Sequence, residues 1–401
     1  MSIYGTGQLS SFARQYSYLN EATILIIYEM VTVFITLWLL DKKYKRKIDE
    51  YHRIDPINRF PVINFSVGNM FFFLAVSAWL FIAFFYKNLV GGFSVLISGA
   101  LNEMREVEQV EYNASNIIGG IIWQTLCIWL YTYIVVKQRN KLENTASNRP
   151  FIGAIVLTAF TIILSFIDQA GLSRWFTIVM TGATVSCLIR LFPDKRKTIV
   201  ATVITPAALL VLFITLFKNV GLILGEGTVK DALLDLFDPS KMDIYFAGPV
   251  NVNNAYYLVK NYDLNVFTIF NDICNNMPIV NHYMDTRATS VYAYNESLGR
   301  IYENNAGDQI IPLIGQSMMY FSEILAPVLS CISVWVACWA GYKFSKCKNF
   351  MFFAYAFIAV WFGVESMMLN VTITCSWIYN RIIPFVIALS ITNKAAGIYK
   401  S

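Results

Sequence analysis

The sequence predicts an all-α polytopic membrane protein with one large loop subdomain on its outer face. The chain of 401 residues is 56% hydrophobic and only 14% charged, whereas a soluble domain carries about 25% charged residues. Its apolar residues occur in blocks of about 20 residues, the length of helix that crosses a bilayer. Connectors rich in Lys and Arg alternate with connectors that contain few of them, as in proteins that cross a membrane several times.

The apolar blocks predict about nine or more transmembrane helices. They lie near residues 21–40, 61–86, 117–136, 151–168, 174–192, 199–222, 319–341, 349–370 and 374–392. Residues 1–20 are polar, and the first apolar block lacks a small-residue cleavage site. We therefore expect no cleavable signal peptide.

The charge of the connectors predicts the orientation of these helices. The connector DKKYKRKIDEYHRIDPINRF is strongly basic, and so are the later connectors KQRNKLENTASNR, PDKRK and KFSKCKN. Cytoplasmic connectors are enriched in Lys and Arg, so we expect the N-terminus outside and the C-terminus inside. The formal net charge of +5 then arises mostly from these connectors and implies no nucleic-acid partner.

Residues 223–318 form an extramembrane segment long enough to be a subdomain. We therefore expect an N-terminal transmembrane bundle over 1–222, a large extracytoplasmic loop over 223–318 and C-terminal transmembrane helices over 319–401. A loop of this length is usually functional or disordered, and its content of Tyr, Phe and Ile opposes disorder. It is predicted to pack as a lid on the outer ends of the helices.

The sequence offers few residues for a metal ion or a nucleotide cofactor. It contains seven cysteines, without a CxxC pair, and two histidines, so neither a zinc site nor a disulfide framework is indicated. It has no glycine-rich nucleotide-binding motif, and the large loop has no DxD pair for the metal of a nucleotide-sugar. We therefore expect no cofactor and no metal.

The few cationic side chains of the large loop are candidates for binding phosphate. Arg287 lies in HYMDTRATS with His282 and Asp285 beside it, and Lys260 and Arg300 lie elsewhere in the loop. Arginine suits phosphate because its planar guanidinium donates two parallel hydrogen bonds and keeps its charge. Arg287 could instead pair with Asp285 or cap the lid, and His282 could be a packed or surface residue.

Three ionisable residues fall inside predicted transmembrane helices: Glu29, Glu365 and Arg381. Such residues are costly in hydrocarbon and mark functional sites by default. Each lies roughly 10–12 Å below the outer surface, given the helical rise of about 1.5 Å per residue. We expect one charged layer that opens toward the large loop; the alternative is a structural pair of Glu365 with Arg381 that locks the last hairpin.

The junction between the large loop and the next helix carries more polar residues than anchoring requires. The stretch ENNAGDQIIPLIGQ contains Asp308, Gln309 and Gln316 around Pro312 and Gly315. Aromatic rings beside amides and carboxylates suit sugars, because rings cover the C–H faces and polar groups bind the hydroxyls. An AT-rich gene would also enrich Tyr, Asn and Ile, so composition leaves both explanations open.

Three segments between residues 245 and 330 resemble the bacterial oligosaccharide repeat unit polymerases, the Wzy-type polymerases of O-antigen and capsule. They are YFAGPVNVNNAYYLVK, MDTRATSVYAYNESLGR and GDQIIPLIGQSMMYFSEILAPVLS. A small departure is Ser322-Glu323, where the pattern of the family has Phe-Gly.

The resemblance implies a membrane glycosyltransferase with a GT-C-like bundle, acting on repeat units linked to undecaprenyl pyrophosphate at the outer face of the cell membrane. The growing glycan would leave its lipid pyrophosphate and join the non-reducing end of a new lipid-linked repeat, without a nucleotide or metal cofactor. The implied partners are this lipid-linked oligosaccharide and the lipid bilayer. A polysaccharide chain-length regulator and a flippase are further possible partners.

The resemblance also implies roles for the candidate residues. Arg287, followed by Arg300 and Arg381, would stabilise the leaving pyrophosphate, because charge stabilisation counts most in a water-poor site. A base for the acceptor hydroxyl is also required. The candidates near the reacting centre are His282, Asp285 and Asp308, and the remaining substrate-binding candidates are Gln309, Gln316, Asn251 and Lys260.

Three alternatives stay open from the sequence. A ligase that moves finished polysaccharide from the same lipid to another acceptor would share this chemistry and topology. A flippase or other transporter of lipid-linked oligosaccharide would show internal pseudo-symmetry and no large outer lid. A purely structural membrane subunit would leave the ionisable residues inside helices unexplained.

Overall fold

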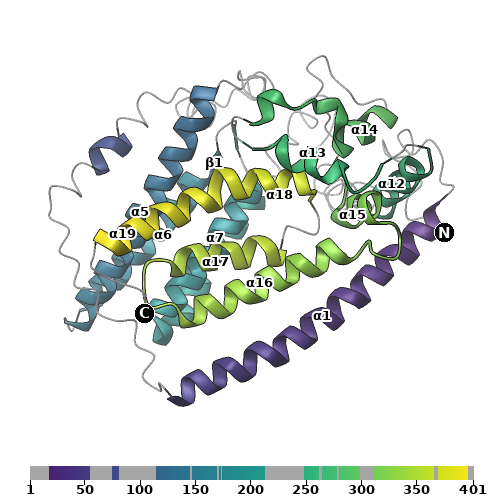
Figure 1. Cartoon of the computed structure of the whole chain (residues 1–401). Coiled ribbons are helices and arrows are strands. Elements are labelled where there is room, and N and C mark those ends of the chain that lie inside the picture. Colours follow the sequence, from purple (N-terminus) through teal and green to yellow (C-terminus); the bar gives the residue numbers. More distant parts are fainter. Residues whose placement is uncertain are drawn as a thin grey trace, which may run out of the picture. The chain divides into compact units, whose positions relative to one another are not determined.

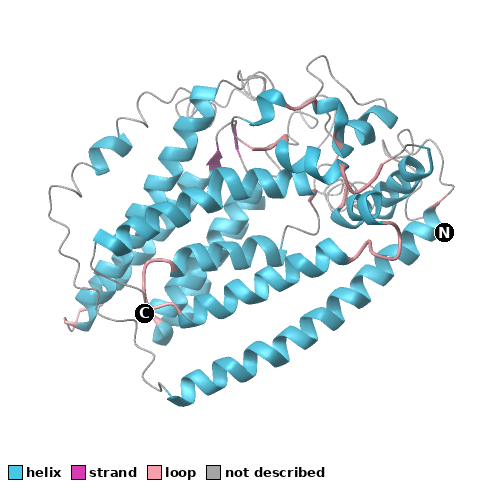
Figure 2. Cartoon of the chain, in the orientation of Figure 1, coloured by secondary structure: helices cyan, strands magenta, loops and turns pink. Residues whose placement is uncertain are grey.

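The computed structural model of the chain describes residues 18–54, 75–80, 114–144, 147–168, 171–172, 174–212, 248–261, 264–277, 280–298, 310–364 and 369–395. Within these ranges nearly every element is a helix, as Figure 2 shows. The exception is an antiparallel pair of two-residue strands, β1 (Ile167–Asp168) and β2 (Gly171–Leu172). The predicted all-α class is confirmed for the described residues.

Four described helical segments are long and apolar enough to cross a membrane. They are α1 (Leu19–Ile54), α5 (Ala114–Glu143), α16 (Val328–Lys346) and the continuous run of α18 (Val371–Trp377), η6 (Ile378–Ile382) and α19 (Ile383–Ala395). A fifth span results if α7 (Arg174–Leu191) and the helical segment Pro193–Leu212, bent by 119°, count as one. These helices fit a membrane protein.

Several predicted blocks coincide with these helices, and others lie partly outside the described residues. The block 151–168 overlaps the shorter apolar helix α6 (Arg149–Phe166), and the block 349–370 contains α17 (Phe352–Val364). Of the block 61–86, residues 75–80 are described and are helical. Residues 213–247, including the start of the large loop, lie outside the described residues. The total number of spans and the side on which the loop lies stay predictions.

The chain divides into two compact units, which we describe separately. The first unit contains Met1–Asp49, Leu233–Trp339 and Trp361–Asn380. The second unit contains Glu50–Ala232, Ala340–Val360 and Arg381–Ser401. The three sequential domains proposed from the sequence stay a prediction.

In the second unit α5, α6 and α7 pack against one another, and α19 packs against α5. Aromatic rings fill the core, where Phe357 meets Phe176 and Phe385 edge to face. Pro193 begins a short 3-10 turn, η2 (Pro193–Lys195), just after α7. Proline suits the first helical position but cannot extend a preceding helix. Pro193 therefore accounts for the bend between α7 and the helical segment Pro193–Leu212.

In the first unit four short helices gather at one end (Figure 1): α12 (Pro249–Asn261), α13 (Thr268–Cys274), α14 (Ser290–Ser297) and α15 (Leu313–Phe321). We call them, with the 3-10 turns η4 (Val280–Tyr283) and η5 (Thr286–Ala288), the loop subdomain. Proline stands at the first position of α12 and directly before α15, where its missing N–H costs no helical bond.

The predicted block 319–341 is divided between two helices. The helix α15 ends at Phe321, and α16 begins at Val328. Between them Ser322 has φ 78° and ψ 171°, a conformation that glycine adopts almost exclusively. Pro327 directly precedes α16 and has no N–H to continue a helix from the turn. The sequence did not predict this interruption, because apolar residues lie on both sides of it.

Replacing Ser322 with glycine is expected to stabilise the protein by about 1 kcal/mol, because it removes the strain of a side chain at this φ. The measurement is unfolding in mixed micelles as the SDS fraction is raised. Ser186→Gly is the matched control; it lies within helical α7, where glycine is expected to cost about 0.5–1 kcal/mol. Destabilisation by both substitutions would contradict strain at Ser322.

Candidate functional site

The described parts of the three segments that carry the resemblance include α12, α14 and α15, which meet in the loop subdomain. The helix α12 packs against both α14 and α15, and these three helices share one apolar core with the start of α1. Buried side chains from each segment contribute, including Val252 of α12, Tyr294 of α14 and Ile314 of α15. Residues far apart in the sequence thus form one compact structure.

A connected set of buried polar groups crosses this core, and we call it the Asp272 network. The Asp272 carboxylate accepts a hydrogen bond from the Tyr320 hydroxyl at 2.5 Å and from the Ser290 backbone N–H at 3.1 Å. Gln316 donates through Nε2 to Ser290 Oγ at 2.8 Å, and its Oε1 accepts from the Val371 N–H at 2.6 Å. The network therefore joins α13, α14, α15 and α18.

The network is closed to solvent. Asp272, Ser290 and Gln316 are 0% exposed and Tyr320 is 5% exposed. Burial raises the pKa of the Asp272 carboxyl above its ordinary value of 3.8, and the hydrogen bonds from Tyr320 and Ser290 oppose that rise. Among the described residues no Lys, Arg or His forms an ion pair with Asp272. In the described part of the chain, hydrogen bonds therefore satisfy this buried carboxyl.

The predicted substrate-binding amides of α12 and α15 point into the protein. Asn251 is 3% exposed, and its Oδ1 accepts from the Tyr294 hydroxyl at 3.1 Å. Its neighbour Asn253 accepts from the Tyr18 backbone N–H at 3.0 Å and so ties α12 to the start of α1. Gln316 belongs to the Asp272 network. In this conformation neither Asn251 nor Gln316 can reach a ligand in solvent.

Arg287, His282 and Asp285 lie together on the exposed turns η4 and η5. The Asp285 carboxylate accepts from the Arg287 backbone N–H at 2.9 Å and thereby caps η5. This bond involves the backbone of Arg287 and not its guanidinium, so the alternatives in which Arg287 pairs with Asp285 or caps the lid stay predictions. The three side chains remain accessible to a ligand.

The other candidate residues are more scattered. Lys260 pairs with Glu323 at 3.6 Å, and both side chains are about half exposed, so this pair contributes roughly 0–1 kcal/mol. Arg381 belongs to the second unit, where its guanidinium lies 5.0 Å from the centre of the Phe176 ring. Three further candidates lie outside the described residues: Arg300, Asp308 and Gln309.

The expected layer of charge in the helices is described only in part. The Glu29 carboxylate of α1 accepts a hydrogen bond from the Ser330 hydroxyl of α16. Glu365 lies outside the described residues, so neither its place in the layer nor the alternative pair with Arg381 is described. Both the layer and the pair stay predictions.

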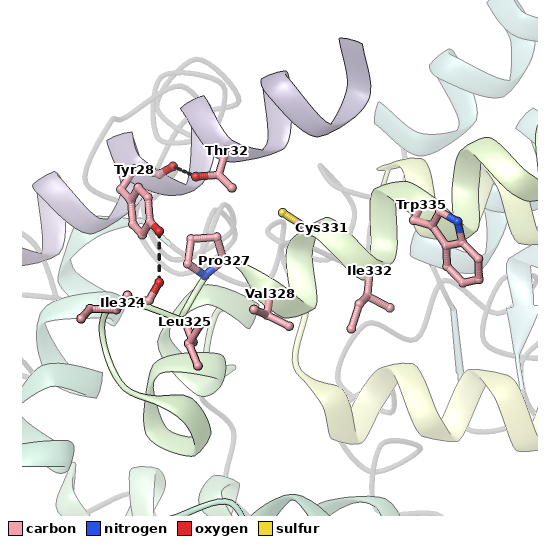
Figure 3. Close-up of a pocket in the computed structure, with 9 residues that line it drawn as sticks. All are labelled: Tyr28, Thr32, Ile324, Leu325, Pro327, Val328, Cys331, Ile332 and Trp335. Atoms are coloured by element: carbon pink, nitrogen blue, oxygen red, sulfur yellow. Dashed lines mark hydrogen bonds between the residues drawn. The ribbon is translucent and has the colours of Figure 1, made fainter. Parts of the chain in front are cut away.

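An apolar groove of about 350 Å³ lies between α1 and the turn that leads into α16 (Figure 3). Its lining includes Pro327, Cys331 and Trp335, and its polar edge is formed by Tyr28 and Thr32. The Tyr28 hydroxyl donates to the Ile324 carbonyl oxygen at 3.0 Å and so joins two lining residues of the groove. The broken helix thus leaves a recess beside two candidate membrane spans.

No family of known proteins matches this chain when family models are compared with it, and comparisons with curated proteins and with solved structures give no match either. Membership of the polymerase family therefore stays a proposal that rests on the three segments. Among the described residues, no three His, Cys, Asp or Glu side chains are grouped so that they could hold a metal ion.

Sequence reasoning missed Asp272, Ser290 and Tyr320. Asp272 and Ser290 lie in short stretches with polar neighbours, TIFNDIC and SVYAYNES, where a single carboxylate or hydroxyl is unremarkable. The available signal was Gln316 and Tyr320, which are four residues apart and therefore share one face of the helix that starts at Leu313.

Proposed function

We propose that this protein polymerises lipid-linked oligosaccharide repeat units into a surface polysaccharide, O-antigen or capsule, at the outer face of the cell membrane. Undecaprenyl pyrophosphate carries both the growing glycan and the incoming repeat. In this proposal the protein has about nine or more transmembrane helices and an outward-facing loop subdomain. No cofactor takes part.

The observation that carries the proposal is the meeting of the three polymerase-like segments in one subdomain. One of them, MDTRATSVYAYNESLGR, contains the exposed carboxylate of Asp285 and the exposed cation of Arg287, and the exposed His282 lies two residues before this segment, on the turn η4.

The proposed chemistry is a displacement at the anomeric carbon of the growing glycan. The bond from that carbon to the pyrophosphate oxygen breaks, and a bond to the acceptor hydroxyl forms. Arg287 stabilises the negative charge that develops on the leaving pyrophosphate. His282 or Asp285 accepts the proton of the acceptor hydroxyl, provided that the acceptor binds within hydrogen-bond reach.

The lipid part of the substrate needs an apolar surface next to the loop subdomain. The groove beside Pro327, Cys331 and Trp335 starts at the turn that follows α15 and runs along α16 (Figure 3). We assign the isoprenoid tail to this groove. Trp335→Ala would then weaken binding of the lipid-linked substrate more than it changes the turnover of bound substrate.

Arg287→Ala is expected to abolish long chains when it replaces the wild type in a host that lacks this gene. The measurement is the chain-length ladder of the surface polysaccharide. Wild type should restore long chains, whereas the variant should leave single repeat units because the pyrophosphate loses its stabilising charge. Arg287→Lys, which keeps the charge without the planar fork, should give intermediate lengths.

Glu296→Gln is the matched control, since Glu296 is exposed on α14 of the same subdomain and has no role in the proposed chemistry. It should give the wild-type ladder. Long chains that stay lipid-linked in the deletion strain would favour a ligase, and single repeats that accumulate on the cytosolic side would favour a flippase. Either result would overturn the polymerase proposal.

A further inference from the structure

Two consecutive residues of α13 hold the short segment that carries Arg287. Asn271 donates through Nδ2 to the Ala288 carbonyl oxygen at 3.1 Å. Asp272 accepts from the backbone N–H of Ser290, at 3.1 Å through Oδ1 and at 3.4 Å through Oδ2. The peptide groups on both sides of Thr289 are therefore bound to the same helix.

Among the described residues, the turn η5 forms few other hydrogen bonds with the rest of the loop subdomain. Its own bonds are local: the Arg287 N–H donates to Asp285, and the Thr289 hydroxyl donates to the Thr286 carbonyl oxygen at 2.7 Å. Its residues Thr286, Arg287 and Ala288 are all exposed. Because no side chain of η5 is buried against the described residues, we expect the contacts with Asn271 and Asp272 to determine where Arg287 lies relative to the rest of the loop subdomain.

We propose that Asp272 is a positioning residue for Arg287, acting through the backbone of Ser290. The proposal rests on the proposed function, since it assumes that Arg287 binds the pyrophosphate. Asp272 is fully buried and does not touch substrate. Its carboxylate binds the backbone N–H of Ser290, the first residue of α14. Arg287 lies three residues before Ser290, so fixing Ser290 also restricts the position of Arg287.

A carboxylate suits this task better than an apolar residue would. Burying a carboxyl group is costly unless hydrogen bonds satisfy it, so shape-filling alone would select an apolar side chain. Asp272 instead accepts from an N–H at the start of a helix, where negative charge is favourable, and from a phenol at 2.5 Å, a distance typical of charge-assisted bonds. These bonds have defined directions, which apolar contacts lack.

The helix α15 holds the positioning group from the other side. Tyr320 binds the carboxylate, and Gln316 binds the Ser290 hydroxyl, both from one face of α15. Gln316, which the sequence analysis placed among the polar residues of this junction, therefore supports the segment that carries Arg287. A shift of Arg287 by about 1 Å is enough to cost roughly a hundredfold in rate.

The first measurement is hydrogen–deuterium exchange of the full-length protein in lipid nanodiscs, comparing wild type with Asp272→Ala. The proposal expects loss of protection confined to residues 286–290, with α12 and α16 unchanged. Asp272→Asn keeps an oxygen that can accept from the Ser290 N–H and should restore most of that protection. Faster exchange throughout the first unit would mean a purely structural role, and unchanged exchange at 286–290 would mean no positioning; both outcomes overturn the proposal.

The second measurement is polymerisation by the same variants, at equal protein levels. Asp272→Ala should slow polymerisation by roughly a hundredfold, Asp272→Asn should retain most of the rate, and Asp272→Ala should add much less than that factor to the loss caused by Arg287→Lys, which keeps a measurable rate. Additive losses would overturn the proposal. Asn271→Ala, which removes only the bond to Ala288, replaces Asp272→Ala if that variant does not accumulate.

Hydrogen–deuterium exchange tests the positioning role of Asp272, and polymerisation tests the proposed function of Arg287, so the two can fail separately. If Arg287→Ala polymerises normally, the proposed function of Arg287 fails. The exchange of residues 286–290 in Asp272→Ala still decides whether Asp272 fixes that segment.

Discussion

Gln316→Leu is expected to lower the free energy of unfolding by about 3 kcal/mol, because the substitution leaves the buried Val371 N–H without a partner and removes the shorter hydrogen bond of the Ser290 hydroxyl. Gln316 is 0% exposed and uses both ends of its amide. Its Nε2 donates to Ser290 Oγ, and its Oε1 accepts from the Val371 N–H at 2.6 Å. Leucine has a similar size but can form neither bond, so the Val371 N–H at the start of α18 stays unsatisfied.

Unfolding in mixed micelles as the SDS fraction is raised measures this loss. Gln138→Leu is the matched control: Gln138 is half-buried in α5, and the described residues offer it no hydrogen-bond partner. That variant should stay within about 0.5 kcal/mol of wild type. Equal losses at the two positions would show that the hydrogen bonds of Gln316 contribute nothing specific.

The position of Gln316 illustrates what the sequence could predict. Pro312 followed by an apolar stretch predicts a helix start, and α15 does begin at Leu313. The sequence also shows that an amide, Gln316, lies in the first turn of that helix. Its environment was not predictable, because its partners Ser290 and Val371 are 26 and 55 residues away in the sequence.

The same limit explains Asn251 and Asp272. The run VNVNN is typical of a polar surface. In the structure, however, Asn251 accepts a hydrogen bond from the Tyr294 hydroxyl and Asn253 accepts one from the Tyr18 backbone N–H. Asp272 reads as one polar residue among several, and only folding brings Tyr320 to it. Apolar periodicity depends on the local sequence, whereas a buried polar pair depends on contacts that form across the fold.

The break between α15 and α16 at Ser322 is a third feature that the sequence did not predict. Here the cause is local and does not depend on contacts across the fold. Apolar residues on both sides of Ser322 and Glu323 gave a block at 319–341 long enough to span a membrane. Length and hydropathy do not register a single residue with positive φ, and Ser322 is the one non-glycine residue of this kind among the described residues. The nearby Pro327 was the visible signal for a new helix start.

Gly315→Ala is expected to lower the free energy of unfolding by about 2 kcal/mol, because α12 and α15 are too close for a side chain. A Cβ added at Gly315 would lie 2.9 Å from the Cβ of Ala255, with Pro312 and Ile311 at 3.5 and 3.6 Å. None of these neighbours is the end of a flexible side chain, so the two helices must move apart. Overpacking of this kind typically costs about 1–3 kcal/mol, more than the gain in helix propensity.

Gly341→Ala is the control, and we expect it to raise the free energy of unfolding instead of lowering it. A Cβ at Gly341, within α16, meets nothing within 4 Å, so this substitution should stabilise the protein by up to about 1 kcal/mol through helix propensity alone. Both variants are measured by unfolding in mixed micelles. A stabilising Gly315→Ala would show that α12 and α15 tolerate separation. The expected loss would instead mean that the contact between α12 and α15 fixes the helix from which Gln316 and Tyr320 reach the Asp272 network.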